Sequence, residues 1–187
     1  MPESTSNRRT LHRVRRLFAH NMSEKVVRSL NLLLYGNGQK ACDACFACEK
    51  LLTGTPRLDV GRALRSGSAV IVAEMGTDIV GCVLVHFEAA GVHLYALCVA
   101  KTARGMGIGS SLLHAVHRSF GHLDIDLNVL RIADRSTPCG IETDRRFRHL
   151  IPFYQSHGYQ IVQRRTQYWK LTRPGGWQSA DNDSAGI

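Results

Sequence analysis

The sequence predicts an α/β fold built on a mixed, mostly antiparallel central sheet flanked by helices. Three apolar, β-branched runs at about 69–74, 79–87 and 91–100 follow one another across short turns, which favours antiparallel pairing. A glycine-rich turn, a helix and another strand come next, and this order favours a parallel crossover within the same sheet. A sheet with both kinds of pairing, covered by helices, is a layered α/β fold.

The chain is long enough for one domain with terminal extensions. It has 187 residues, and a chain of that length can bury roughly 70% of its extended surface without metals or disulfides. We expect a basic N-terminal segment over 1–20, one domain over 21–173 and a disordered tail over 174–187. No apolar run approaches the roughly 20 residues that a membrane-spanning helix requires.

The first third of the chain predicts helices before the sheet. Residues 10–18 fit either a first strand or the start of a helix, because Arg and His interrupt both patterns. From 21 to 36 the apolar spacing is helical, and Asn21 with Glu24 three residues later has the form of a capping box. Two further helical segments, separated by a loop, are predicted between residues 40 and 67.

The second half of the domain predicts two more helices and three more strands. The apolar residues after the glycine-rich turn lie at helical spacing, and residues 124–132 alternate strictly between apolar and polar, as in a half-buried strand. Residues 134–143 predict a loop. The next helix ends at Gly158 and either kinks or begins at Pro152. The chain closes with a pair of strands over 159–172.

The stretch Lys101–Leu113, KTARGMGIGSSLL, concentrates three glycines between a strand and a helix. Its spacing excludes the phosphate loop that ends in Lys-Ser/Thr and the dinucleotide loop G-x-G-x-x-G. What remains is a helix N-terminus, where the first backbone N–H groups lack intrahelical partners and the helix dipole favours an anion. Two interpretations stay open: an anion-binding turn to which Arg104 adds charge, or a tight turn without a ligand.

This stretch resembles the acetyl-CoA loop of the GNAT superfamily of N-acetyltransferases, which has the core R/Q-x-x-G-x-G/A. Arg104, Gly107 and Gly109 fill those positions, and Val99 ends the preceding strand five residues before the arginine. Downstream, Phe153–Tyr159 (FYQSHGY) resembles the second motif of the family, F-Y-x-x-x-G-F/Y. The order of strands and helices also agrees with the family over a little more than half of the chain.

The resemblance implies a GNAT-like sheet with a parallel, splayed strand pair around the cofactor, and direct transfer of the acetyl group of acetyl-CoA to a primary amine. In such enzymes the strand before the loop binds the pantetheine arm and the loop holds the diphosphate. A backbone N–H polarises the thioester carbonyl, and a tyrosine protonates the leaving thiolate. Tyr154 occupies the tyrosine position, although it also fits a core tyrosine. The implied acetyl-CoA-binding residues are Leu97, Cys98, Val99, Arg104, Gly105, Met106, Gly107, Ile108, Gly109 and Ser110.

The base that deprotonates the amine departs from the family pattern. A lysine-type amine has a pKa of about 10.4, so a proton must be removed before it attacks. Histone-type members carry a glutamate six residues before the closing valine, and that position is His93 here. Histidine titrates near neutrality and can act as the base. A strand histidine without function is the alternative, and other candidate bases are Asp126, Glu88 and Glu74.

The sequence does not identify the acceptor. An insertion around 134–144 lies where acceptor specificity is often set in the family. The net charge is +9, and the excess of Arg and Lys falls in 1–28 and 145–173. A polycationic acceptor would therefore need a local acidic cleft, for which Asp124 and Asp126 are the paired candidates. A small amine, an amino-acid derivative or a protein N-terminus needs no such cleft.

A competing hypothesis is a basic module that keeps the cofactor fold, binds nucleic acid and lacks turnover. Its support is the positive charge, together with the aromatic residues among the arginines of 145–173. We rank nucleic acid below an amine acceptor as a partner and expect no membrane partner. Dimerisation is common in the family, so the resemblance also allows a homodimer.

Cysteine and histidine clusters have simpler explanations than a metal site, so we expect no metal. The Cys-x-x-Cys-x-x-Cys run lacks a fourth ligand and is explained by thiols buried on one side of a helix; it comprises Cys42, Cys45 and Cys48. His114 and His117 predict a solvated helix face. Cys82 and Cys98 lie in apolar strands, where thiols act as small hydrophobic groups, so we expect a reduced, cytoplasmic protein.

Overall fold

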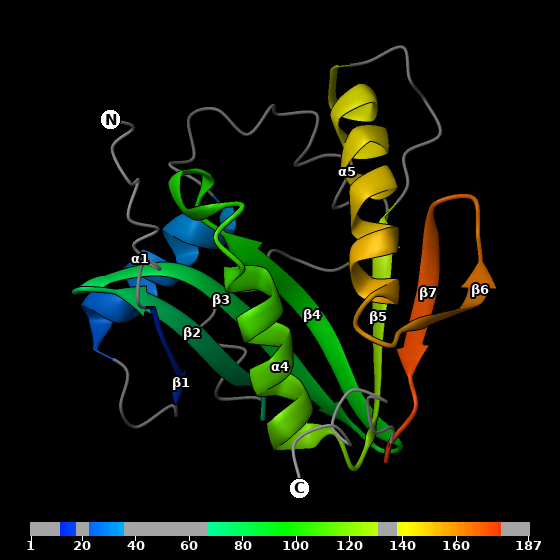
Figure 1. The fold of residues 1–187 in the computed structure, drawn as a ribbon, viewed down its shortest axis with the longest axis horizontal. Coiled ribbons are helices and arrows are strands. Elements are labelled where there is room, and N and C mark those ends of the chain that lie inside the picture. Colours follow the sequence, from blue (N-terminus) through cyan, green and yellow to red (C-terminus); the bar gives the residue numbers. More distant parts are fainter. Residues whose placement is uncertain (1–11, 18–22, 36–66, 131–137, 177–187) are drawn as a thin grey trace, which may run out of the picture.

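The computed structural model describes residues 12–17, 23–35, 67–130 and 138–176, and it confirms the mixed α/β fold (Figure 1). The elements are β1 (Arg13–Leu17), α1 (Glu24–Tyr35), β2 (Ala69–Met75), β3 (Asp78–Glu88), β4 (Gly91–Val99), the 3₁₀ turn η2 (Lys101–Ala103), α4 (Ile108–Phe120), β5 (Asp124–Leu130), α5 (Pro138–Gln155), β6 (Gln160–Arg164) and β7 (Tyr168–Arg173). The described strands form one sheet in the order β1-β2-β3-β4-β5-β7-β6.

All neighbouring strands in this sheet pair antiparallel except β4 and β5, which are parallel. Their pairing is short: Gly91–Leu94 lie opposite Asp124–Leu127, and the register ends there. Each strand continues beyond the last pair, β4 to Val99 and β5 to Leu130, and the two ribbons diverge (Figure 1). The predicted splayed pair is therefore present, at the centre of the sheet.

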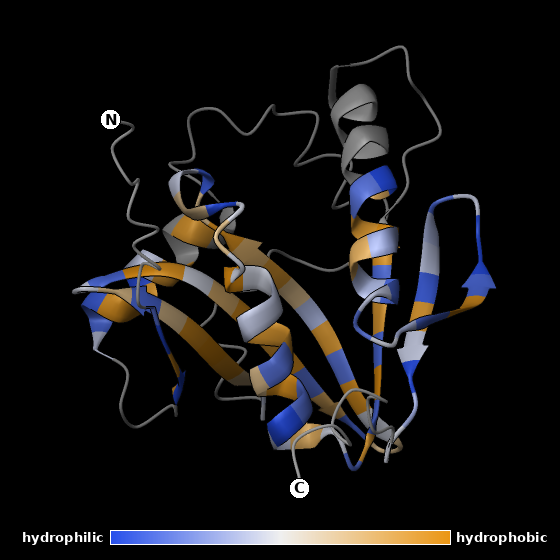
Figure 2. Ribbon diagram, viewed as in Figure 1, coloured by the Kyte–Doolittle hydropathy of each residue, from blue (hydrophilic) through white to orange (hydrophobic). Residues whose placement is uncertain are grey.

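Helices cover both faces of the sheet. On one face, α4 and α5 pack against the larger core, in which the five apolar residues predicted for the α4 helix are all buried: Ile108, Leu112, Leu113, Val116 and Phe120. On the other face, α1 packs Leu30 against Val72 and Leu84 of the sheet. Figure 2 shows β2 coloured as hydrophobic over most of its length, because both of its faces are covered, whereas polar and apolar residues alternate along β5.

The N-terminal region resolves one alternative and corrects one expectation. Arg13–Leu17 form a strand that pairs antiparallel with β2 at the edge of the sheet. The helix α1 begins at Glu24, so its cap position is two residues after the proposed Asn21 cap, which lies outside the described residues. Ser23 fills the cap position instead, because its Oγ accepts the Val26 N–H at 3.4 Å.

The helix α5 corrects both of its predicted ends and resolves one alternative. It begins at Pro138, so residues 138–143, predicted as part of a loop, are helical. Pro at the first helical position is favourable because its missing N–H would have no intrahelical partner there. Pro152 lies inside the helix, which excludes the alternative that the helix begins there. The helix ends at Gln155, three residues before the predicted Gly158, which has φ +86°.

Some predictions fall on parts of the chain that the structure leaves undescribed. These are the helical segments between residues 40 and 67, with the run Cys42, Cys45 and Cys48, and the tail beyond residue 176. Among the described helices, none combines the length and apolar character needed to cross a membrane.

Candidate functional site

The glycine-rich stretch forms a turn between β4 and α4 whose backbone requires glycine at two positions. Gly105 has φ +78° and Gly107, the N-cap of α4, has φ +75°. L-residues avoid this left-handed region, because Cβ approaches the following carbonyl oxygen too closely. A Cβ built at either glycine meets no atom within 4 Å, so the turn presents open space on that side. Glycine is thus needed here for its conformation and not for packing.

The first turn of α4 offers unpaired donors in a positive environment. Ser111 is the first residue whose N–H donates within the helix, to the Gly107 carbonyl at 3.0 Å. The three N–H groups before it have no intrahelical acceptor. No acidic residue occupies the first turn, while Lys101 and Arg104 are exposed beside it. A helix N-terminus with these neighbours favours an anion.

The other predicted loop residues divide into backbone and side-chain roles. The Arg104 Nε–H donates to the Val99 carbonyl at 3.2 Å, which holds the exposed guanidinium near the end of β4. The Met106 side chain is 38% exposed, whereas the Ile108 side chain is buried in the core. Ser110 lies half-buried in the first turn of α4. Ile108 can therefore meet a ligand only through its backbone.

The fold brings the two sequence motifs into contact. A Cβ built at Gly109 would lie 3.3 Å from the ring of Phe153 on α5. The close approach explains why a residue without a side chain stands there. Phe153 is followed by Tyr154, so the loop and the predicted acid come from adjoining parts of the structure although 45 residues separate Gly109 from Tyr154.

Tyr154 is buried, with 6% of its surface exposed. Its ring packs edge-to-face on Phe153 and on Tyr159, at centroid distances of 5.3 and 5.6 Å. Burial raises the pKa of the Tyr154 hydroxyl above its ordinary value, so the group keeps its proton at neutral pH. Both alternatives from the sequence, a core tyrosine and a proton donor, are compatible with this environment.

A β-bulge in β4 lies where β4 and β5 separate. Leu84 of β3 pairs with Ala96, but the next residue, Val85, pairs with Leu94, so Tyr95 is the extra residue. Leu94 is also the last residue of β4 that is in register with β5. The predicted segment Leu97–Val99 follows, paired to β3 on one side only within the described sheet. Its other edge faces the opening between β4 and β5.

His93 belongs to a charged row across three strands. Its Nδ1 hydrogen-bonds to Asp126 Oδ1 on β5, and Asp126 Oδ2 contacts the Lys170 ammonium of β7 at 2.5 Å. The hydrogen bond to Asp126 raises the pKa of Lys170. Asp126 was one of the candidate bases, but the sequence did not point to its partner Lys170. The sequence showed only that the polar residues of 124–128 lie on one face of the strand.

The two predicted catalytic residues occupy opposite faces of the sheet. Val92 and Leu94, the neighbours of His93, point into the core beneath α4 and α5, and so does Tyr154. His93 therefore points to the other face, because side chains alternate along a strand. The register of β4 with β5 ends one residue after His93, at Leu94.

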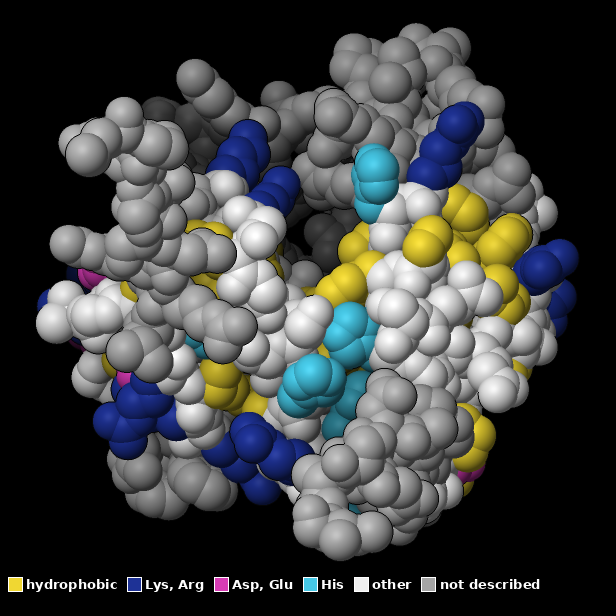
Figure 3. All heavy atoms as spheres, viewed as in Figure 1, with side chains coloured by type: hydrophobic (Ala, Val, Ile, Leu, Met, Phe, Trp, Pro, Cys, Tyr) yellow, Lys and Arg dark blue, Asp and Glu magenta, His cyan; other side chains and the backbone are white. Residues whose placement is uncertain are grey.

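A histidine cluster lies between α4 and the end of α5 (Figure 3). The rings of His114 and His157 are 5.6 Å apart, and His117 Nε2 lies 3.3 Å from the Tyr159 hydroxyl. His114 is exposed, as predicted, but His117 is half-buried. Burial, aided by Arg173 and the other two histidines, lowers the pKa of His117 from 6.5 to about 3. Its imidazole is therefore neutral across the physiological range.

The acidic residues proposed for a polycation-binding cleft already have partners. Asp126 is shared between His93 and Lys170, and Asp124 Oδ1 accepts the Gly175 N–H at 2.7 Å. Glu74, another candidate base, is held by Arg15 through two bonds of 2.7 and 3.0 Å at the opposite edge of the sheet.

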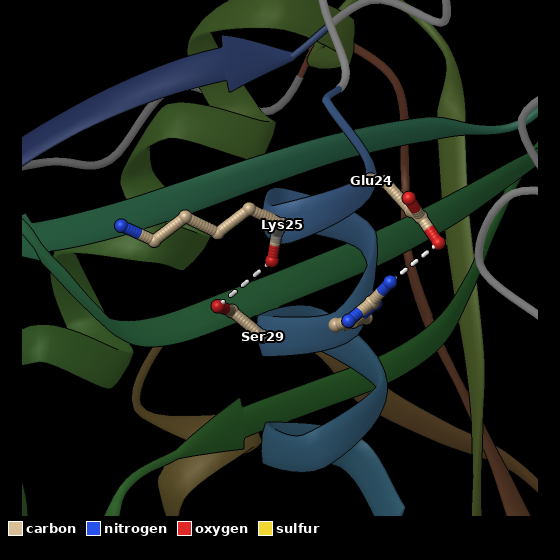
Figure 4. Close-up of a pocket in the computed structure, with 4 residues that line it drawn as sticks. Glu24, Lys25 and Ser29 are labelled. Carbon is tan, nitrogen blue, oxygen red and sulfur yellow. Dashed lines mark hydrogen bonds and ion pairs between the residues drawn. The ribbon is translucent and has the colours of Figure 1, made fainter.

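A pocket on α1 does not involve any of the predicted site residues (Figure 4). Its lining comes from about one and a half turns of that helix. Arg28 pairs with Glu24 at 2.6 Å, and the Ser29 hydroxyl donates to the Lys25 carbonyl at 3.0 Å. These are local contacts of an exposed helix surface, and an exposed i,i+4 ion pair such as Arg28–Glu24 contributes only about 0.3–0.5 kcal/mol.

Comparison with known families places this turn within a recognised domain. Residues 66–161, about half of the chain, match the model of the acetyltransferase (GNAT) domain family. This segment includes the bulged strand, the glycine-rich turn, Tyr154 and His93. A search of curated proteins gave no matching sequence.

Solved structures of similar fold come from several microorganisms. Escherichia coli ElaA superposes with a TM-score of 0.58 at 17% identity, over 87% of this chain and 99% of that one. A PaiA N-acetyltransferase from Thermoplasma acidophilum, solved in complex with coenzyme A, superposes with a TM-score of 0.58 at 13% identity, over 88% of this chain and 99% of that one. An acyl-CoA N-acyltransferase from Pseudomonas aeruginosa superposes with a TM-score of 0.59 at 13% identity, over 87% of this chain and 99% of that one.

Proposed function

The chain belongs to the GNAT acetyltransferase family, and on this premise we propose that it transfers the acetyl group of acetyl-CoA directly to a primary amine. Acetyl-CoA is the acyl donor of this family, and the PaiA structure that shares the fold holds coenzyme A. The observation that carries the proposal is the left-handed glycine turn at the N-terminus of α4, with its unpaired amides and no acidic residue.

The turn suits a diphosphate. The proposed donors are the backbone N–H groups from Gly105 to Ser110, with Arg104 adding a positive charge. Since Gly105 and Gly107 carry no Cβ on an open side, phosphate oxygens can approach the backbone closely. The fold supplies the helix dipole and the fixed amides before the ligand arrives, so little conformational entropy is lost on binding.

The strand β4 suits the pantetheine arm. Leu97, Cys98 and Val99 have one edge paired to β3 and the other facing the opening beside β5. An extended amide-containing chain can hydrogen-bond along such an edge as an added strand does. The bulge at Tyr95 turns the backbone where the reactive end of the arm would lie. A backbone N–H at this point is the proposed donor to the thioester carbonyl, in the manner of an oxyanion hole.

His93 and Tyr154 are the proposed proton carriers. His93 takes one proton from the acceptor ammonium, and the neutral amine nitrogen then bonds to the acetyl carbon as the carbon–sulfur bond breaks. Tyr154 gives its hydroxyl proton to the sulfur, and its oxygen takes the second proton that the nitrogen loses. The products are an acetamide and a free thiol, and His93 releases its proton to water. Their location on opposite faces supports this division, because the attacking amine and the departing sulfur must occupy different sides of the carbonyl carbon.

The engaged carboxylates favour an acceptor that is not a polycation. Asp124 and Asp126 were the candidates for an acidic cleft, and both already interact with groups of the protein. A small amine, an amino-acid derivative or a protein N-terminus places less demand on local negative charge. We propose acceptors of this class.

A screen with acetyl-CoA and a panel of amines tests the function. Thiol release that depends on a particular amine, with an acetylated product seen by mass spectrometry, is the expected result. Absence of turnover with every amine, together with nucleic-acid binding that weakens steeply with salt, would replace the proposal with the non-catalytic module.

Two substitutions test the proton carriers once an acceptor is known. Tyr154→Phe removes only the hydroxyl from a buried ring, so folding should survive while kcat falls by about 100-fold. His93→Ala should lose activity mainly below about pH 8, where an ammonium acceptor needs a base. Full kcat/KM for His93→Ala between about pH 6 and 9 would remove His93 from the mechanism.

A further inference from the structure

The row His93–Asp126–Lys170 contains a hydrogen-bonding arrangement that the family resemblance does not account for. One side chain comes from each of three adjacent strands, β4, β5 and β7. His93 and Asp126 are direct register partners in the short parallel stretch. Their side chains are 18% and 16% exposed, so both are mostly shielded from water. The contact between His93 and Asp126 therefore follows from the sheet register. Lys170 reaches Asp126 from the β7 position opposite Asn128, and its side chain is 39% exposed.

The two oxygens of Asp126 have different partners. Oδ1 faces His93 Nδ1 and Oδ2 contacts Lys170 Nζ at 2.5 Å. An ionised carboxylate can only accept hydrogen bonds, so the Nδ1 of His93 must carry its proton in this arrangement. In the neutral imidazole the other nitrogen, Nε2, then has a free lone pair. The carboxylate thus selects the tautomer in which Nε2 can accept a proton.

Lys170 completes the arrangement by balancing charge. Its ammonium lies against the oxygen of Asp126 that His93 does not use, so the carboxylate has a cationic partner that is separate from the histidine. The other titratable groups around the row are His86, which is the β3 register partner of His93, Glu88 at the end of β3, and Tyr168 on β7.

We infer that Asp126 is a positioning residue that fixes the Nδ1-protonated tautomer of His93, with Lys170 keeping the carboxylate ionised. This inference rests on the proposed function for its kinetic consequence, but the tautomer itself is a property of the free protein. His93 lies one residue before Leu94, where β4 and β5 separate, so its imidazole stands at the closed end of the opening. Nε2 is the atom proposed to receive the amine proton.

Nuclear magnetic resonance of the ligand-free protein tests the tautomer directly. With ¹⁵N-labelled histidine, the wild-type protein should show His93 protonated at Nδ1. Asp126→Asn lets an amide N–H donate to Nδ1 and should shift His93 toward the Nε2-protonated form. The control Asp78→Asn, at the exposed first residue of β3, should not. Nε2-protonated His93 in the wild type, or no change in Asp126→Asn, would overturn the inference. This result does not depend on finding the acceptor.

A double-mutant cycle tests the kinetic role. Asp126→Asn should lower kcat by about tenfold or more without changing the KM for acetyl-CoA.

Lys170→Met should move the ascending limb of the pH–rate profile to higher pH, since the carboxylate then favours the imidazolium. In a His93→Ala background, Asp126→Asn should have little further effect, because it acts only through that histidine. Additive losses in the double variant would show a structural role instead, whereas absence of turnover in the wild type would count against the proposed function alone.

Discussion

Gly107→Asp separates the role of the loop in binding from its role in folding. Gly107 has φ +75° at the N-cap of α4, and a Cβ there meets nothing within 4 Å. Gly176 is a matched control, with φ +73° and equally open surroundings. Its N–H donates to the carbonyl of Gly121 at the opposite end of α4. Thirteen helical residues, a length of about 20 Å, separate the two sites.

The stability cost of the two variants can be worked from this geometry. A non-glycine residue in the left-handed region costs about 1–2 kcal/mol, and neither position adds a steric clash. A carboxylate near the helix N-terminus recovers about 0.3–1 kcal/mol, whereas near the C-terminus it costs a similar amount. The free energy of unfolding should therefore fall by about 1 kcal/mol in Gly107→Asp and by about 2 kcal/mol in Gly176→Asp. For a chain of this size each kcal/mol lowers Tm by about 2–4 °C.

The affinity for acetyl-CoA should fall more in Gly107→Asp than in Gly176→Asp, which is the reverse of the order for stability. A carboxylate about 4 Å from a phosphate charge is repelled by about 1 kcal/mol in water and about 4 kcal/mol near a protein surface. The Kd for acetyl-CoA should thus rise by about fivefold to a thousandfold in Gly107→Asp and stay unchanged in Gly176→Asp. Isothermal titration with thermal melting of all three proteins measures both quantities. Wild-type affinity in Gly107→Asp, or equal weakening in the two variants, would refute the reasoning.

Three further predictions concern packing and charge at other positions of the fold. Gly109→Val should crowd the Phe153 ring, because a Cβ at residue 109 would already lie 3.3 Å from it. The free energy of unfolding should fall by about 1–3 kcal/mol and kcat should decrease, which thermal melting and turnover assays measure. His117 has a folded pKa of about 3 against 6.5 when unfolded, so the unfolded chain binds more protons in acid. Allowing for its partial exposure, unfolding free energy should fall by about 1–2 kcal/mol from pH 7 to 5, and His117→Gln should flatten that slope; an unchanged slope would contradict the assignment. Arg15→Met should cost about 1 kcal/mol or less, because the guanidinium is 40% exposed, and chemical denaturation should show a smaller cost in high salt.

The strands were predictable because their signal is local. The hairpin of β2 and β3 was predicted from two apolar, β-branched runs around a glycine turn, and the structure confirms it. Strict alternation predicted β5, whose Ile125, Leu127 and Val129 are all buried. In β5 a period of two residues in the sequence corresponds directly to the two faces of a strand, whereas β2 is buried on both faces and its apolar run is continuous.

The helix boundaries were harder to predict because tertiary packing decides them. The start of α5 contains Pro, Gly and several polar residues, which are typical of a loop, and the helix nevertheless begins at Pro138. At α1, the sequence pattern predicted a cap at Asn21, but the Ser23 hydroxyl accepts the Val26 N–H and caps the helix. Propensity is a weak prior at helix ends, where a change of one or two residues costs little.

The candidate site likewise has a part that could be predicted from the sequence and a part that could not. The glycine turn could be predicted because three glycines, an arginine and a following amphipathic helix are contiguous in the chain. Contact between Gly109 and Phe153, and the shared use of Asp126 by His93 and Lys170, depend on strand order and register. No spacing in the sequence specifies that register, so these contacts became visible only in the folded chain.

The most direct test of the account is a crystal structure of the protein with bound acetyl-CoA. We predict diphosphate oxygens within hydrogen-bonding distance of the amides from Gly105 to Ser110. We also predict the pantetheine arm along Leu97–Val99, in the opening that begins after Leu94. A bound acetyl-CoA that leaves the amides of the β4–α4 turn facing solvent, with its diphosphate elsewhere on the surface, would contradict the account.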